Sequence, residues 1–283
     1  MSERVAAPSV EARAGEARAG EAGAGGNACP PGAVELAERM ADAAGDVLRR
    51  YFRTPVAVED KDDASPVTLA DRESEAAMRA MIAAAFPDHG ILGEEYGGDR
   101  TDAEWVWVLD PLDGTRAFIT GKPSFGILIA LLHRGRPVLG VIDQPILRER
   151  WLGVAGRPST LAGRAIRTRP CSELARAALY ATGPEMFEGA DATAFERLRR
   201  AVKLTRFGAD CYAYGLLAAG FVDLVVEASL KPYDYCALVP VIEGAGGIIT
   251  DWRGRPLGLD SDGRVAAAGD ARLHAQALAA LAG

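Results

Sequence analysis

Residues Trp105–Thr115 read WVWVLDPLDGT, and this stretch decides how the rest of the chain is interpreted. Its first half is a short apolar run bounded by a turn signal, which is typical of a buried strand. Its second half places Asp110 and Asp113 at the end of that strand, with Pro111 between them to stiffen the backbone. Two carboxylates held close together raise each other's pKa, and a cation between them relieves that repulsion. Hard divalent ions such as Mg²⁺ prefer such oxygen ligands.

The two residues that follow favour a bound anion. Gly114 allows the backbone to approach a ligand closely, and Thr115 begins a predicted helix whose free N–H groups attract negative charge. The stretch is therefore typical of a metal-dependent phosphate site. The alternative is a plain turn, since Asp-Gly is a common turn and Asp or Thr is a common helix N-cap.

Three other acidic segments bear on that choice. Residues Gly93–Gly97 read GEEYG after a predicted short strand, and isolated carboxylates such as Glu94 are costly to bury. Residues Lys231–Leu238 read KPYDYCAL, in which Asp234 opens an apolar helix. Asp71 lies where a polar segment leads into another predicted helix. Taken singly, the first is also compatible with a solvated loop and the second with an N-cap.

Together, these segments resemble the inositol monophosphatase family of Mg²⁺-dependent phosphatases. The shared motifs are the GEE loop, the W-x-x-D-P-x-D-G-T strand and loop, and a late aromatic-Asp pair before a Gly-rich helix end. The resemblance runs from about residue 34 to the C-terminus, with Tyr233 where many members have Trp. It implies an α+β / α/β fold, the layered αβαβα sandwich of the inositol monophosphatase and fructose-1,6-bisphosphatase type.

The resemblance also implies a site that holds two or three Mg²⁺ ions. The implied metal ligands are Glu94, Asp110, Asp113, Asp234 and the main-chain carbonyl of Leu112, with Asp71 helping to hold a third, weaker ion or its water shell. The implied catalytic residues, which position a water for in-line attack on phosphorus, are Glu94, Thr115 and Asp71. Asp113 and the N–H groups of Gly114 and Thr115 are expected to hold the phosphate. No residue is an obvious covalent nucleophile, so no phosphoenzyme is expected.

Four further segments look like the histidinol-phosphate phosphatase branch of the family; they are Gly126–Leu132, Gly140–Pro145, Gly208–Tyr214 and Val225–Asp234. The branch implies hydrolysis of L-histidinol phosphate to L-histidinol and phosphate in histidine biosynthesis. The alternative is a phosphatase of the same family that acts on inositol 1-phosphate, fructose 1,6-bisphosphate or a nucleotide 3′-phosphate. A binding protein that kept the fold and lost the chemistry is a further class, and the intact acidic motifs argue against it.

Histidinol carries an ammonium and an imidazole, so its pocket requires acceptors and negative charge. Asp210 lies where relatives acting on sugar or inositol phosphates usually have a small residue, and its carboxylate is suited to the ammonium. It is equally suited to cap a predicted helix over 212–219. Glu227 lies where relatives contact polar groups of the substrate. Arg206 is a candidate contact for phosphate or for a pocket carboxylate, or else a surface arginine.

Composition limits the partners. The chain has 283 residues, 49% of them hydrophobic, and its net charge of −7 argues against a nucleic-acid surface. No apolar run reaches the roughly 18 to 20 residues that span a bilayer, and the first residues lack a secretion signal. The four cysteines have no metal-type spacing, which favours reduced thiols in the cytoplasm. We therefore expect a cytoplasmic enzyme with a small phosphorylated substrate, no nucleic-acid or membrane partner, and, by resemblance, a homodimer.

The pattern along the chain predicts three parts. Residues 1–30 form an Ala/Gly/Glu-rich tail expected to be disordered, 31–155 an N-terminal α+β half with the metal site, and 156–283 a C-terminal α/β half with substrate-pocket residues. The predicted helices cover 34–51, 71–85, 192–201, 212–219 and 236–245. The predicted strands include 125–133, 137–143, 149–154 and 224–227.

Overall fold

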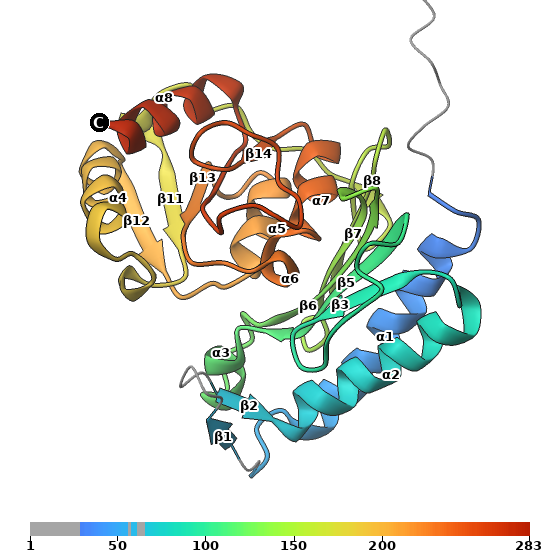
Figure 1. Cartoon of the computed structure of the whole chain (residues 1–283). Coiled ribbons are helices and arrows are strands. Elements are labelled where there is room, and N and C mark those ends of the chain that lie inside the picture. Colours follow the sequence, from blue (N-terminus) through green and yellow to red (C-terminus); the bar gives the residue numbers. More distant parts are fainter. Residues whose placement is uncertain (1–28, 56–57, 61–65) are drawn as a thin grey trace, which may run out of the picture.

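The computed structural model describes residues 29–55, 58–60 and 66–283. Most of the tail for which disorder is expected, residues 1–28, therefore lies outside the described residues. The two larger sheets and three helical layers alternate through the molecule (Figure 1), so the αβαβα sandwich expected from the resemblance is confirmed. Within the described ranges, no helix combines the length and the apolar character that a membrane crossing requires.

The first layer is a pair of packed helices, α1 (Ala33–Tyr51) and α2 (Leu69–Ala85). Between them in sequence lie two short paired strands, β1 (Val58–Asp60) and β2 (Pro66–Thr68). The buried face of α1 recurs at helical spacing and faces the first sheet; it includes Leu36, Met40, Ala44 and Leu48. Helix α2 begins two residues before the predicted start because the Thr68 hydroxyl caps it by accepting from the Ala70 N–H.

The first sheet has eight strands in the order β10-β9-β8-β7-β6-β5-β3-β4. Their bounds are β3 (Gly90–Gly93), β4 (Gly97–Asp99), β5 (Trp105–Asp113), β6 (Gly126–His133), β7 (Arg136–Gln144), β8 (Glu149–Val154), β9 (Thr160–Leu161) and β10 (Arg164–Ala165). The antiparallel run β5–β8 includes the predicted strands over 125–133, 137–143 and 149–154, and β3 pairs with β5 in parallel. The sheet thus continues past residue 155, and the proposed division into two halves stays a prediction.

The register of β5 against β6 shifts between Asp110 and Asp113. This irregularity ends regular pairing where the two aspartates stand, as bulges commonly do beside functional sites. Gly114 follows with a left-handed φ of 83°, and the short helix α3 (Thr115–Ile119) begins directly after it. A side chain at Gly114 would be strained in this conformation.

The middle layer lies between the two sheets (Figure 1) and consists of α5 (Tyr212–Ala218), α6 (Pro232–Tyr235) and α7 (Leu238–Gly244). The prediction of a single helix over 236–245 is wrong at its start. Helical structure begins earlier, at Pro232, and is divided into α6 and α7. Pro240 lacks the N–H that would bond the carbonyl of Cys236, so the helical ladder is interrupted there.

The second sheet has the strand order β12-β11-β13-β15-β14. Its strands are β11 (Ala178–Ala181), β12 (Leu204–Phe207), β13 (Leu224–Glu227), β14 (Ile248–Thr250) and β15 (Val265–Ala268). Helices α4 (Gly189–Ala201) and α8 (Ala271–Ala282) cover its outer face as the last layer. Two 3₁₀ turns, η1 (Leu174–Arg176) and η2 (Pro184–Met186), flank β11. The strands β11 and β13 run parallel, so their C-terminal ends meet at the edge that faces the middle layer and the end of β5.

Candidate active site

Three carboxylates from distant parts of the chain meet at the end of β5. Asp110 and Asp113 come from the strand itself, and Asp234 comes from α6, which packs against β5 and β6. One oxygen of each lies within 4.8 Å of the other two. We call these three residues the carboxylate cluster. Since Asp110 is only 1% exposed, the cluster is anchored inside the protein rather than on a solvated surface.

Backbone N–H groups hold each carboxylate of the cluster. Asp110 accepts from Leu112 at 3.0 Å, Asp113 accepts from Cys211 at 2.6 Å, and Asp234 accepts from Lys231 at 2.6 Å; these are main-chain donors in every case. Hydrogen bonds to ionised acceptors are short and strong, so the side chains are oriented before any ligand arrives. The bond from Cys211, at the start of α5, also joins the second half of the chain to β5.

The electrostatics of the cluster are unfavourable without a cation. Burial raises the pKa of Asp110 well above its ordinary range, and the charges of Glu94, Asp113 and Asp234 raise it further. Burial likewise raises the pKa of Asp113, and it raises that of Asp234 to about 7. A set of close, desolvated carboxylate oxygens is the donor chemistry that Mg²⁺ prefers, so the residues fit the metal that the sequence implies.

Glu94 follows β3, and its N–H donates to the Leu109 carbonyl at 3.2 Å. The loop is thereby tied to β5, and the Glu94 carboxylate interacts directly with Asp110. Glu94 lies beside the cluster without belonging to the group within 4.8 Å.

The residue that shapes this loop, Glu75, was not predicted from the sequence. Glu75, fully buried on α2, accepts from the N–H groups of Glu95 at 2.7 Å and Tyr96 at 3.3 Å. A Cβ at Gly93 would lie 1.9 Å from the Glu75 carboxylate, so a side chain there would displace this carboxylate from the loop. The spacing of Asp71 and Glu75 along one face of α2 is the only signal in the sequence that points to Glu75.

Asp71 and Thr115 lie together at the same site. The Thr115 hydroxyl lies 3.4 Å from Asp71 and 3.2 Å from the Leu112 carbonyl, so the latter oxygen, an implied metal ligand, accepts from Thr115 here. Asp71 also accepts from the N–H and hydroxyl of Thr68. Burial raises the pKa of Asp71, although the bonds from Thr68 lower it in part.

Asp210 packs directly on the turn that follows β5. A Cβ at Gly114 would lie 2.8 Å from the Asp210 carboxyl carbon, and the Ser124 hydroxyl donates to this carboxylate at 2.9 Å. Burial raises the pKa of Asp210, and Ser124, Lys122 and Arg116 lower it in that order. The Asp210 side chain does not cap α5, whose N-cap is Cys211 with no side-chain cap bond. The helix-cap alternative is therefore wrong.

Glu227 ends β13 and is 2% exposed. Its two oxygens accept from the Thr182 N–H at 2.7 Å and from the Tyr214 hydroxyl at 2.9 Å. Burial raises its pKa, and these two bonds oppose the rise. Tyr214, which the sequence analysis did not single out, therefore holds Glu227 near Asp234.

Arg206 lies on the edge strand β12, opposite Tyr180 of β11, and is exposed. Within the described ranges, no hydrogen bond or ion pair joins its guanidinium to Asp210, Glu227 or the carboxylate cluster. The structure thus brings together every site residue expected from the sequence except Arg206.

Comparisons with known proteins agree with this geometry. The sequence profile of the inositol monophosphatase family matches residues 33–282. The chain is 53% identical over 255 residues to the bifunctional phosphatase IMPL2, chloroplastic, of Arabidopsis thaliana, covering 87% of this chain and 74% of that protein. It is 35% identical over 236 residues to the histidinol-phosphatase of Chlorobaculum parvum, covering 83% of this chain and 91% of that protein.

Among solved structures, an inositol monophosphatase from Zymomonas mobilis is 51% identical and superimposes with a TM-score of 0.82, covering 88% of this chain and 97% of the other. The profile match spans nearly all of the described residues, including both halves of the site. The chain therefore belongs to the inositol monophosphatase family of Mg²⁺-dependent phosphatases.

Proposed function

We propose that this phosphatase hydrolyses L-histidinol phosphate to L-histidinol and phosphate, as a step of histidine biosynthesis. The observation that carries the proposal is the position of Asp210, whose carboxylate lies against Gly114 beside the expected phosphate position. A carboxylate there attracts the substrate's ammonium, whereas a neutral polyol gains little from it. Several curated relatives, at about 35% identity, carry the name histidinol-phosphatase.

We assign the metal ligands to the carboxylate cluster together with Glu94 and the Leu112 carbonyl, for two Mg²⁺ ions, with Asp71 near a third. Bound Mg²⁺ supplies charge neutralisation at the phosphate and lowers the pKa of a coordinated water. The raised pKa values of Asp110, Asp113 and Asp234 support this assignment, because a cation removes the repulsion that raises them.

The remaining residues orient the reactants. The Thr115 hydroxyl donates toward Leu112 or Asp71, so its lone pair faces away from them and accepts a hydrogen bond from the attacking water. Glu94, which is held beside Asp110, takes one proton from the water as the water attacks phosphorus in line with the leaving oxygen, the bond from phosphorus to that oxygen breaks, and the leaving alkoxide takes a proton from solvent. Asp113 and the N–H groups of Gly114 and Thr115 hold the phosphate. Glu227, fixed by Tyr214, supplies a second negative charge to the alcohol side of the pocket. We assign no contact to Arg206.

A second candidate substrate is inositol 1-phosphate. The Zymomonas structure, titled an inositol monophosphatase, favours it, and the Arabidopsis relative, named a bifunctional phosphatase, is compatible with more than one substrate. Both are more similar to this chain than the curated relatives that carry the name histidinol-phosphatase.

The test compares kcat/KM for L-histidinol phosphate, myo-inositol 1-phosphate and fructose 1,6-bisphosphate at matched Mg²⁺. We expect histidinol phosphate to be preferred, and Asp210→Asn to reduce kcat/KM for it by roughly tenfold to a hundredfold, the range for loss of one charged hydrogen bond. Activity on the inositol substrate should change far less. Asp46→Asn, at an exposed position on α1, is the matched control and should change neither activity.

A preference for inositol or fructose phosphate that Asp210→Asn leaves unaltered would exclude the histidinol assignment and leave the phosphatase assignment standing. We also propose, on the sequence grounds given above, that the chain acts in the cytoplasm as a homodimer. Cell fractionation and light scattering of the purified chain test these two points.

A further inference from the structure

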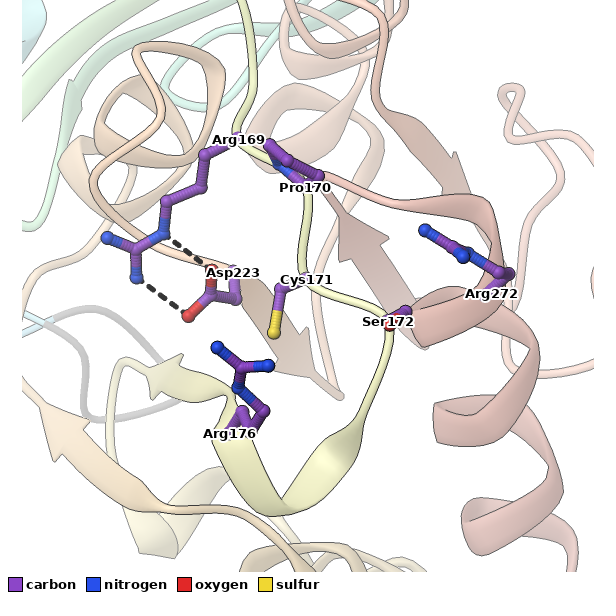
Figure 2. Close-up of a pocket in the computed structure, with 7 residues that line it drawn as sticks. All are labelled: Arg169, Pro170, Cys171, Ser172, Arg176, Asp223 and Arg272. Atoms are coloured by element: carbon purple, nitrogen blue, oxygen red, sulfur yellow. Dashed lines mark hydrogen bonds and ion pairs between the residues drawn. The ribbon is translucent and has the colours of Figure 1, made fainter.

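A cleft outside the active site lies in the C-terminal half and has a cavity volume of about 240 Å³. We call it the arginine cleft. The residues that line it include Arg169, Cys171, Ser172, Arg176, Asp223 and Arg272 (Figure 2).

The arginine cleft is separate from the active site. Asp223 immediately precedes β13 and accepts from the Ala178 N–H at the start of β11, at 2.8 Å. Glu227 and Thr182, which belong to the active site, lie at the opposite ends of the same two strands. The cleft therefore opens at the N-terminal ends of these parallel strands and the catalytic groups at their C-terminal ends.

Two of the arginines in the cleft are already paired. Arg169 makes a bidentate ion pair with Asp223, at 2.6 and 2.7 Å, and the Asp223 side chain is 3% exposed. Arg272 pairs with Asp270 at 3.0 Å. These pairs fix both guanidinium groups in place, while each arginine keeps N–H donors that its aspartate does not use.

The third arginine, Arg176, has no ion-pair partner among the described residues. Across the described parts of the chain, no hydrogen bond or ion pair involves the guanidinium of Arg176 or the hydroxyl of Ser172. Figure 2 shows the Arg176 guanidinium beside Cys171, on the side of the cleft where Asp223 lies. The three arginines thus have two carboxylate partners, and the unbonded Ser172 hydroxyl lines the same cleft.

We propose that the arginine cleft binds a phosphate-class oxyanion, with Arg176 and Ser172 as its main donors. Planar guanidinium groups match the oxygens of phosphate in pairs, which makes arginine the usual residue for such anions. The cavity exceeds the space that one phosphate requires, so the source is either free phosphate or the phosphoryl group of a small metabolite.

Cys171 provides a direct probe, because its half-buried thiol lies within the cleft. The experiment follows alkylation of the full-length, Mg²⁺-loaded protein by N-ethylmaleimide, read at each cysteine by peptide mass spectrometry. Inorganic phosphate should slow modification of Cys171 by about tenfold at saturation while leaving Cys29, a half-buried thiol in the other half, unchanged. Potassium chloride at the same ionic strength should protect neither thiol.

Variants locate the effect. Arg176→Gln should raise the phosphate concentration for half-protection by about tenfold, and Ser172→Ala should raise it by a smaller factor. Arg39→Gln, an exposed arginine on α1, is the matched control and should behave as the wild type. Methylphosphonate, which cannot be hydrolysed, distinguishes the sources: protection by both anions indicates a phosphoryl group, and protection by phosphate alone indicates the free ion.

The proposal is overturned if phosphate protects Cys171 no better than chloride. It is equally overturned if Arg176→Gln and Ser172→Ala, both with wild-type phosphatase activity as proof of folding, keep the full protection.

Discussion

At the scale of single residues, Glu227 illustrates how this site keeps a buried charge. Its two oxygens accept from the Thr182 N–H and the Tyr214 hydroxyl, and these bonds oppose the effect of burial on its pKa. A buried acceptor that loses its donor bears the full cost of desolvation. The Tyr214 hydroxyl therefore matters for stability as well as for the charge in the pocket.

Tyr214→Phe removes that donor and should lower the free energy of unfolding by about 1–3 kcal/mol. It should also raise KM for histidinol phosphate, because a Glu227 that protonates more readily presents less negative charge. Denaturant unfolding and steady-state kinetics measure both effects. Tyr180→Phe, a half-buried tyrosine of β11 with no hydroxyl bond among the described residues, is the control. Equal stability of the two variants would contradict this role for Tyr214.

The residues that the sequence predicts at the site are those whose chemistry shows in a local motif. Asp110 and Asp113 stand three residues apart at the end of one apolar run, so both are predicted near one strand end, although the register shift between them is seen only in the structure. Glu75 and Tyr214 could not be predicted, because their partners at the Glu95 amide and at Glu227 lie on other elements. Hydrogen bonds that form only in the tertiary structure leave no pattern along the chain.

At the scale of elements, close packing of α7 on the first sheet depends on glycine. A Cβ at Gly140 of β7 would lie 2.0 Å from the Ala237 carbonyl, and one at Gly153 of β8 would lie 2.3 Å from the backbone of Pro240. The sheet and the start of α7 are thus in direct backbone contact. This contact positions α6, which carries Asp234, against β5 and β6.

Gly153→Ala should therefore destabilise the protein by about 1–3 kcal/mol or more, since the clash is with backbone that cannot rotate away. For a chain of this size, each 1 kcal/mol shifts the Tm by roughly 2–4 °C. Calorimetry at saturating Mg²⁺ measures the change. An unchanged Tm would show that α7 can move off the sheet at no cost.

Helix α8 supplies a pH-dependent contribution through His274, which is buried beside Thr250 at 2.9 Å. Burial lowers the pKa of this imidazole below its ordinary 6.5, so the folded chain binds the proton less readily than the unfolded chain. The contribution of the neutral imidazole to the stability of the fold is fully present above about pH 6.5. It is lost as the pH falls from there through the lowered pKa.

Thermal unfolding of the wild type and of His274→Gln, measured between pH 8 and pH 5, tests that contribution. The wild type should lose more stability on acidification than the variant, which carries no titrating group at this position. Using the difference between the two curves cancels the titration of the site carboxylates, which both proteins share. Parallel curves would contradict the assignment.

Several helices and strands could be predicted from the sequence alone. Helices α1 and α2 and strands β6–β8 lie within two residues of their predicted bounds, because their apolar patterns are strong. The division between α6 and α7 was not predicted. Proline is tolerated in the first turn of a helix and interrupts a helix farther along, so the effect of Pro240 on the helix depends on where the helix begins. The layered arrangement followed from the family resemblance, because periodicity does not specify how two sheets pair.

At the scale of the whole molecule, the site is assembled from both halves of the chain. Asp110 and Asp113 lie on the first sheet. Asp234 lies on α6 of the middle layer, Asp210 lies just before α5, and Glu227 ends β13 of the second sheet. The bond from the Cys211 N–H to Asp113 links the two parts directly. A metal bound at the carboxylate cluster therefore joins the halves and couples activity to the intact fold.

The most direct test is phosphate release from L-histidinol phosphate by the full-length chain, measured in EDTA and again after adding excess Mg²⁺. The account predicts no release in EDTA and full recovery with Mg²⁺. It also predicts that Asp110→Asn, folded by circular dichroism, turns over more than about a hundredfold more slowly at saturating Mg²⁺, since loss of a direct ligand costs more than loss of a supporting contact. Release that persists in EDTA, or an Asp110→Asn variant that retains wild-type turnover, would contradict it.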